Sequence, residues 1–142
     1  MAEKLLRDKI GYKAGQAVLL LNLPDGLADP FDGVEHTVAQ VTKPKLGKRQ
    51  FDLVLAFTRD QSQLAGAAAV VLGALRDDAK LWLAYPKKSG AIKTDLTRDV
   101  GWEPMFAAGY IVVAIAAVDG TWSAVRFRPK ELVKSVRYAT ST

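Results

Sequence analysis

Uninterrupted apolar runs divide the 142-residue chain into short elements of regular structure. A run that does not alternate with polar residues is typical of a strand buried on both faces of a parallel sheet. Such runs predict four strands, at residues 17–21, 51–57, 80–85 and 110–118. Residues 34–41 alternate between apolar and polar side chains and predict a weaker strand.

Two helices and a hairpin are expected between and after these strands. An apolar stripe at helical spacing is formed by Leu64, Ala67, Ala68, Val71, Leu72 and Leu75. Asp60 is expected to cap the start of that helix, with Gln63 three residues later. Residues 94–108 predict a second helix that Gly101 and Pro104 break or kink and that Gly109 ends. A two-residue turn at Asp119 and Gly120 would pair residues 121–128 back as a hairpin strand, and the polar residues 130–142 predict a short last helix.

The alternation of strands and helices indicates an α/β protein with a mostly parallel sheet flanked by helices. The closing hairpin is expected to add one antiparallel strand at the edge of that sheet. The length suits a single domain, which we assign to residues 1–130, followed by a polar basic tail at 131–142.

Composition excludes several kinds of chemistry. The chain has no cysteine and one histidine, so disulfides, thiol nucleophiles, thiolate metal sites and paired-histidine sites are excluded. We therefore predict no catalytic residue and no metal site, and we interpret His36 as a structural histidine. The longest apolar runs, at 64–75 and 110–118, are shorter than the roughly 18 residues of a membrane span. With charged residues throughout positions 1–13, a cytoplasmic protein without membrane contact is expected.

The net charge of +5 is concentrated in two places. Residues 42–50 contain Lys43, Lys45, Lys48 and Arg49 and no acidic residue. Residues 121–142 contain five basic residues and the single acid Glu131. Such patches can bind nucleic acid or an acidic partner. Solvated loops explain them equally well, so nucleic-acid binding is the least favoured of three hypotheses.

Four features resemble the Rossmann-like fold of class I S-adenosylmethionine-dependent methyltransferases. They are Gly15 before Val18-Leu19-Leu20-Leu21, the strand Phe51-Asp52-Leu53-Val54-Leu55, Leu72-Gly73-Ala74-Leu75 before Leu81-Trp82-Leu83, and Ala108-Gly109-Tyr110 before the hairpin. The resemblance implies a three-layer sandwich in a reduced, methyltransferase-like form. More closely, the chain is similar to a group of small bacterial proteins of this fold with no established activity. The segments shared with that group are Tyr85 to Ser89, Thr94 to Trp102 and Trp122 to Phe127.

The sequence departs from the methyltransferase pattern at two cofactor contacts. Methyltransferases place a Gly-x-Gly loop after the first strand, where this chain has Asn22-Leu23-Pro24-Asp25-Gly26. They end the second strand on an acidic residue, where this chain has Gln40, with Glu35 at the wrong end. We therefore expect no cofactor, S-adenosylmethionine included, and a binding or interaction module without methyltransferase activity. The alternative is an atypical enzyme that uses S-adenosylmethionine or a nucleotide.

Ligands of open α/β sheets bind outside the carboxyl ends of the strands. The polar residues expected there are Asn22, Asp25, Arg59, Tyr85, Lys87, Lys88, Ser89, Lys93 and Thr94. Lysines around a small-residue loop, beside the start of a helix, would suit a small anionic ligand. A solvated loop is the structural alternative.

Asp95, Arg98 and Asp99 would share one face of the helix that begins near Thr94. In one interpretation Asp95 or Asp99 orients Arg98 or Lys93 toward a ligand. In the other, these residues form a helix cap and a local ion pair. Core or sheet-edge packing is expected for all three tryptophans, Trp82, Trp102 and Trp122, and Trp102, near the rim loop, is the one of them placed to line a pocket if a site exists there. Core positions are also expected for Met105 and Phe106, and structural roles for Asp52 and Asp119.

Overall fold

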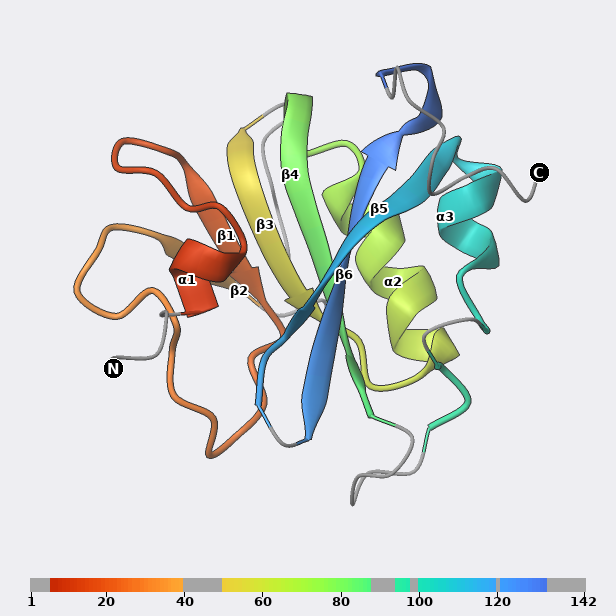
Figure 1. The fold of residues 1–142 in the computed structure, drawn as a ribbon, viewed down its shortest axis with the longest axis horizontal. Coiled ribbons are helices and arrows are strands. Elements are labelled where there is room, and N and C mark those ends of the chain that lie inside the picture. The colour runs from red at the N-terminus through yellow and green to blue at the C-terminus, as the bar shows by residue number, and fades with distance from the viewer. Residues whose placement is uncertain (1–5, 40–49, 88–93, 98–99, 120, 133–142) are drawn as a thin grey trace.

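A computed structural model describes residues 6–39, 50–87, 94–97, 100–119 and 121–132 (Figure 1). Its strands form one six-stranded sheet with the order β2-β1-β3-β4-β6-β5. The strands are β1 (Val18–Leu21), β2 (Thr37–Ala39), β3 (Phe51–Phe57), β4 (Leu75–Pro86), β5 (Tyr110–Ala117) and β6 (Trp122–Pro129). The helices are α1 (Leu6–Lys9), α2 (Gln61–Val71), α3 (Glu103–Ala107) and a 3-10 turn at Lys130–Leu132.

The sheet is mixed, as the sequence predicted. β2, β1, β3 and β4 pair in parallel, whereas β6 runs antiparallel to both β4 and β5. One expectation about the hairpin is wrong: its second strand, β6, lies inside the sheet, and β5 forms the edge. β6 is buried along most of its length and β5 is half-buried or exposed, because only β6 has neighbouring strands on both sides.

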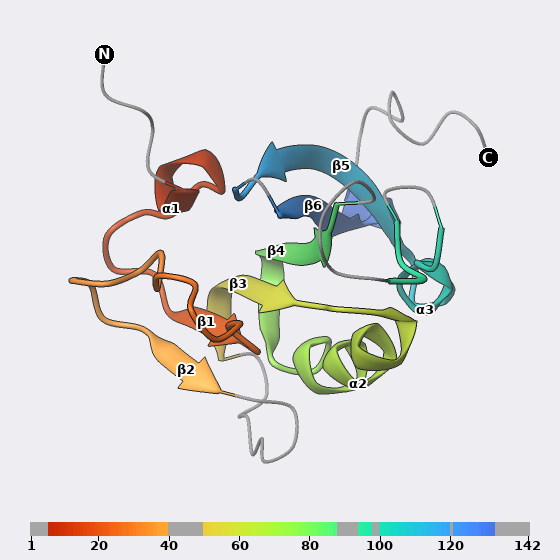
Figure 2. The same cartoon turned by 90° about the horizontal axis from the view of Figure 1, so that it is seen from below.

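Two apolar clusters lie on opposite faces of the sheet. α2 and α3 cover one face, where Leu64, Val71 and Met105 share a cluster with buried residues of β3, β4 and β6 (Figure 2). The other face is covered by α1 and the loop at residues 22–36, through Ile10 and Phe31. This third layer is thus a four-residue helix and a loop, a reduced form of the three-layer sandwich.

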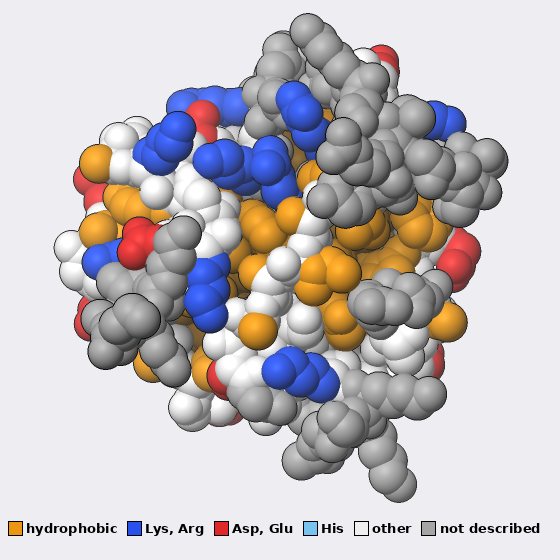
Figure 3. All heavy atoms as spheres, in the orientation of Figure 1, with side chains coloured by type: hydrophobic (Ala, Val, Ile, Leu, Met, Phe, Trp, Pro, Cys, Tyr) orange, Lys and Arg blue, Asp and Glu red, His pale blue; other side chains and the backbone are white. Residues whose placement is uncertain are grey.

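Side chains of β4 hold α1 in place. The indole Nε1 of Trp82 donates to the carbonyl oxygen of Ile10 (2.9 Å), and Nζ of Lys80 donates to that of Gly11 (2.8 Å). Both acceptors lie just past the end of α1, where carbonyl groups have no partner within the helix. On the face of the sheet that carries α1, no helix of the described residues lies over β5 and β6. Hydrophobic side chains are visible on this part of the face (Figure 3).

The start of α2 is as predicted and its end is not. Asp60 is the N-cap, and its Oδ1 accepts from the backbone N–H of Gln63 (2.9 Å). The helix ends at Val71, and Leu75 already belongs to β4, which begins five residues earlier than expected. The apolar stripe could not show this end, since Leu75 is buried in either conformation.

The prediction of a helix over residues 94–108 is wrong for the first half of that range. Residues 94–97 are not helical, and α3 spans only Glu103–Ala107. Gly101 has a φ of +104°, which a right-handed helix cannot include, and Pro104 lies in the first turn of α3, where proline is tolerated. Met105 is buried as predicted, but Phe106 is 49% exposed and does not belong to the core. Of the expected last helix the structure shows only the turn at Lys130–Leu132, and residues 133–142 lie outside the described part.

Candidate functional site

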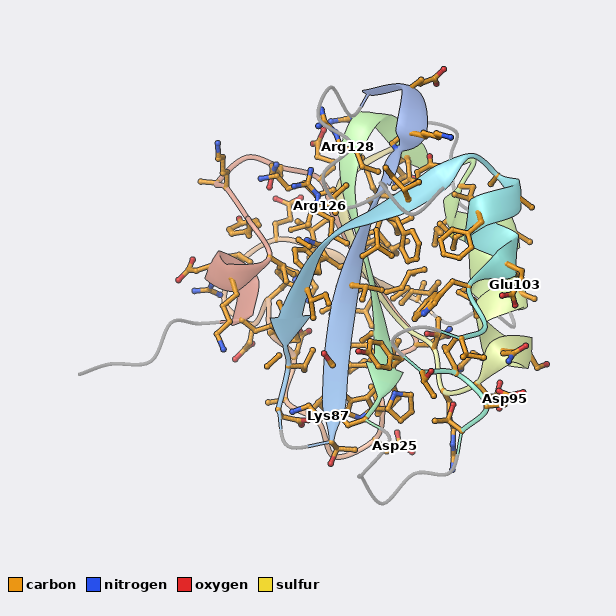
Figure 4. All side chains as sticks on the ribbon, turned by 45° about the vertical axis from the view of Figure 1, so that its right-hand side comes forward. Asp25, Lys87, Asp95, Glu103, Arg126 and Arg128 are labelled. Carbon is orange, nitrogen blue, oxygen red and sulfur yellow. The ribbon has the colours of Figure 1, made fainter. Side chains whose placement is uncertain are left out.

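The carboxyl ends of β1, β3 and β4 lie at one edge of the sheet. Leu21 pairs with Ala56, and Phe57 pairs with Ala84, so the strands end side by side. Polar residues follow each end: Asn22 and Asp25 after β1, Thr58 and Arg59 after β3, and Lys87 after β4. In Figure 4, Asp25, Lys87 and Asp95 lie at this end of the molecule, and Arg126 and Arg128 lie at the opposite end.

Local hydrogen bonds shape these strand ends. The backbone N–H of Asn22 donates to the carbonyl of Ala39 (2.9 Å), and Asn22 has a φ of +59°, which Asn tolerates better than most residues. Thr58 is fully buried, and its hydroxyl donates to the carbonyl of Ala84 (2.7 Å). Thr58 therefore joins two strands, and Arg59, the next residue, is exposed at the edge.

The predicted site residues divide into three groups. Those at or beside the carboxyl edge are Asn22, Asp25, Arg59, Lys87, Thr94 and Asp95. Tyr85 and Trp102 instead lie in the core, with ring centroids 5.7 Å apart. The others, Lys88, Ser89, Lys93, Arg98 and Asp99, lie outside the described residues.

Asp95 caps a helix, but not the one expected. The backbone N–H of Gln61 donates to Asp95 Oδ1 (2.8 Å), and the Gln61 side chain donates to the Asp95 carbonyl (2.7 Å). Thr94 Oγ1 accepts from the N–H of Leu96 (3.0 Å) and so shapes the same turn. The first turn of α2 therefore already holds two carboxylates, those of Asp60 and Asp95. An anion at this edge would be bound by side-chain cations rather than by the helix terminus.

A cavity of about 440 Å³ lies at the opposite, amino edge of the sheet. The sequence did not indicate this cavity, because its lining comes from the starts of four strands and the loops before them. The lining residues are Tyr12, Gly15, Gln16, Ala17, Val18, Glu35, His36, Thr37, Gln50, Phe51 and Arg76. The feature of the sequence that points to this cavity is Gly15, a turn residue just before a buried strand.

His36 in this cavity is held by two acceptors. Its Nε2 lies 2.7 Å from Oδ2 of Asp29, and its Nδ1 lies 2.7 Å from the carbonyl oxygen of Val34. Both partners only accept, so both ring nitrogens carry hydrogen in the fully bonded state, which is the imidazolium. Such a ring has no lone pair with which to act as a base, in line with the structural role predicted for it.

We expect His36 to titrate above its ordinary range. Burial lowers the pKa of His36. The hydrogen bonds to Asp29 and Val34 and the charges of Asp29 and Asp32 raise this pKa by more than burial lowers it, so it lies above its ordinary value of 6.5. Its contribution to stability is complete below about pH 6.5 and is lost as pH rises through the folded-state pKa. Because the chain has one histidine, its ring protons give a single titration curve by NMR. Asp29→Asn should lower the midpoint, and a wild-type midpoint at or below 6.5 would contradict the imidazolium assignment.

Asp52 has the structural role predicted for it at the start of β3. Its Oδ2 accepts from the backbone N–H of Ala17 (2.9 Å) and from Nη1 of Arg76 (2.8 Å). The backbone hydrogen bond, followed by the Arg76 charge, keeps the pKa of this carboxyl below its usual value despite some burial. Asp119 is the turn residue expected, since its Oδ1 accepts from the N–H groups of Thr121 and Trp122 (2.8 Å each).

Two further observations limit the chemistry of the described residues. Among them, no group of three or more His, Asp or Glu side chains is placed to hold a metal ion. Within the same residues, no helix is long and apolar enough to cross a membrane.

No protein-family profile and no curated protein sequence matches the chain. Solved structures do match. A protein from Pyrococcus horikoshii OT3 superposes with a TM-score of 0.58 at 14% identity, over 89% of this chain and 86% of the other. A S-adenosylmethionine-dependent methyltransferase from Aquifex aeolicus gives 0.58 at 14% identity, over 86% of each chain. The 1,6-didemethyltoxoflavin-N1-methyltransferase of Burkholderia thailandensis, solved with S-adenosylhomocysteine, gives 0.58 at 15% identity, over 87% of this chain and 74% of the other.

These similarities agree with a mixed α/β sheet that is mostly parallel and ends in an antiparallel hairpin. At such low sequence identity, structural similarity supports the architecture and not a particular function. The chain has the Rossmann-like fold of S-adenosylmethionine-dependent methyltransferases, in a reduced form.

Proposed function

We propose that this protein is a binding module that takes a small anionic ligand at the carboxyl edge of its sheet and does not transfer methyl groups. The observation that carries the proposal is the placement of Arg59 and Lys87. They follow the ends of two adjacent parallel strands, β3 and β4, at the edge where ligands of open α/β sheets bind. Two cations delivered by neighbouring strands can bind one phosphate or carboxylate group from two sides.

The loop after β1 supports a ligand other than S-adenosylmethionine. Residues 22–36 contain no helix, so β1 is not followed by a helix N-terminus directed at a cofactor. The loop instead packs Phe31, which is fully buried, with Leu23 and Leu27 against the sheet. Pro24 also removes a backbone donor just past the strand.

A second candidate function is an enzyme that uses S-adenosylmethionine. It is favoured by the structural similarity to methyltransferases, including one solved with S-adenosylhomocysteine. It would need the cofactor to be bound without a Gly-x-Gly loop and beside β2, a strand of only three residues.

Calorimetric titration with S-adenosylmethionine separates the two candidates. We expect no binding, or a Kd no tighter than about 1 mM, which corresponds to roughly −4 kcal/mol. Stoichiometric binding at micromolar Kd would overturn the proposal and support the enzyme.

The anion site is tested with inorganic phosphate as the probe. We expect phosphate to shift the amide resonances of Arg59 and Lys87, and Lys87→Gln or Arg59→Gln to weaken its binding at least about fivefold, the loss of one charge-assisted contact. The control is Lys130→Gln, an exposed lysine beyond β6 at the other end of the sheet, which should leave binding unchanged. If phosphate shifts no resonance at the carboxyl edge, or if the control weakens binding equally, the proposed site is wrong.

A further inference from the structure

β5 forms an open edge of the sheet. It follows β6 in the strand order, and no other strand of the described residues pairs with its outer side (Figure 2). It has eight residues, whereas β2 at the opposite edge has three. A long edge strand presents a row of backbone donors and acceptors to which another strand can bond.

The side chains of β5 do little to prevent such pairing. Its sequence, Tyr-Ile-Val-Val-Ala-Ile-Ala-Ala, contains no charged residue and no proline, the usual means by which edge strands are protected. Ile115 is 54% exposed, and the other residues are half-buried or exposed. A bulge between Val112 and Ala114 is the protective feature that the strand does have.

The sequence of β5 is complementary to itself when two copies run antiparallel. With the twofold axis between Val113 and Ala114, most large side chains lie opposite alanine. The four pairs are Tyr110 with Ala117, Ile111 with Ala116, Val112 with Ile115, and Val113 with Ala114. No pair brings like charges together, although the chain carries a net charge of +5.

The short strand β2 disfavours head-to-tail association. Within the part of the chain that the structure describes, pairing of β5 with β2 of the next copy could use only the three residues of β2, and such head-to-tail contacts build rings or open filaments. Pairing of β5 with β5 uses eight residues and closes after two copies. A second copy of this chain is thus the occupant that both the length and the sequence of β5 fit.

We propose that the protein forms a homodimer in which two β5 strands pair antiparallel, so that the two six-stranded sheets continue into each other. The interface lies at the lateral edge of the sheet, separated from β4 by β6, and does not depend on the ligand proposed above. The two proposals can therefore fail separately.

Sedimentation velocity of the full chain tests the dimer. We expect a species of twice the 15.4 kDa mass of one chain, with a Kd in the micromolar range. Ile115→Lys should raise that Kd at least about tenfold, because it places like charges at a paired edge. The matched control is Val38→Lys on β2, since Val38 is 56% exposed at the other edge, and this variant should remain dimeric.

Hydrogen exchange gives a second readout that does not require a variant. The outward amides of β5 should become more protected as the concentration of the wild-type chain rises, whereas those of β2 should not. A wild-type chain that stays monomeric overturns the proposal. A dimer that survives Ile115→Lys, or that Val38→Lys disrupts equally, also overturns it, since the interface would then lie elsewhere.

Discussion

Replacing Trp102 with alanine is expected to lower the free energy of unfolding by about 3–5 kcal/mol, the usual loss for a large buried aromatic residue. Trp102 is 1% exposed. Its ring contacts Tyr85 and Phe127, with centroids 5.7 and 5.3 Å away, and its Nε1 donates to the carbonyl of Thr97 (2.8 Å). The substitution therefore leaves a cavity in the core and removes the shorter of two hydrogen bonds to the Thr97 carbonyl, which then accepts only from the N–H of Val100 (3.4 Å). Urea denaturation followed by circular dichroism measures the loss.

Two variants make this result interpretable. Phe106→Ala removes a ring from α3 that is 49% exposed, and it should cost no more than about 1 kcal/mol. Trp102→Phe keeps an aromatic ring but removes the donor to Thr97, with an expected cost of about 1–2 kcal/mol. If Trp102→Ala costs no more than Phe106→Ala, Trp102 does not fill the core between α3 and the sheet.

Replacing Gly101 with alanine is expected to cost about 2–4 kcal/mol, from backbone strain and overpacking together. Gly101 has a φ of +104°, a conformation that residues with a Cβ rarely adopt. An added Cβ would lie 2.7 Å from Cδ1 of Leu96 and 2.9 Å from Cγ of Gln61. Neither neighbour can move freely, because Leu96 is fully buried and the Gln61 side chain is bonded to Asp95.

Substitutions at two other glycines separate the cost of backbone strain from the cost of overpacking. Gly15 has a φ of +88° but open space around an added Cβ, so Gly15→Ala should show the backbone cost alone, about 1–2 kcal/mol. Gly73 has neither constraint, and Gly73→Ala should be neutral or stabilising by about 0.4–1 kcal/mol. Thermal unfolding of the three variants should give this order, and equal losses at Gly101 and Gly15 would show that Leu96 and Gln61 accommodate the extra methyl group.

Elements defined by their own residues could be predicted from the sequence. β3 has the predicted bounds, 51–57, since seven mostly apolar residues in a row suit a buried strand. Asp60 caps α2 as expected because a cap depends on residues only three positions apart. The carboxyl edge was predictable in the same way: parallel strands end at one edge, and the residues after each strand can be read directly.

Features that depend on distant segments could not be predicted in this way. Asp95 caps α2 through Gln61, 34 positions away in the sequence. The local pattern instead assigned Asp95 to a helix beginning near Thr94. The sequence left two readings of Trp102 open, core packing and a pocket near the rim loop, and only the tertiary structure places its ring in the core. The cavity at the amino edge joins the starts of four strands that are far apart in the chain.

The order of the last two strands shows the difference most clearly. The run of β5 is wholly apolar and that of β6 includes Ser123, Arg126 and Arg128, so the local pattern predicted a hairpin whose second strand lies at the edge. In the structure β6 pairs with β4 on one side and β5 on the other, and β5 is left open. Hydrophobic periodicity determines which residues form strands, because it reflects side-chain burial along the chain. Which strand lies at the edge depends on backbone pairing between distant segments, and that is decided only when the whole sheet assembles.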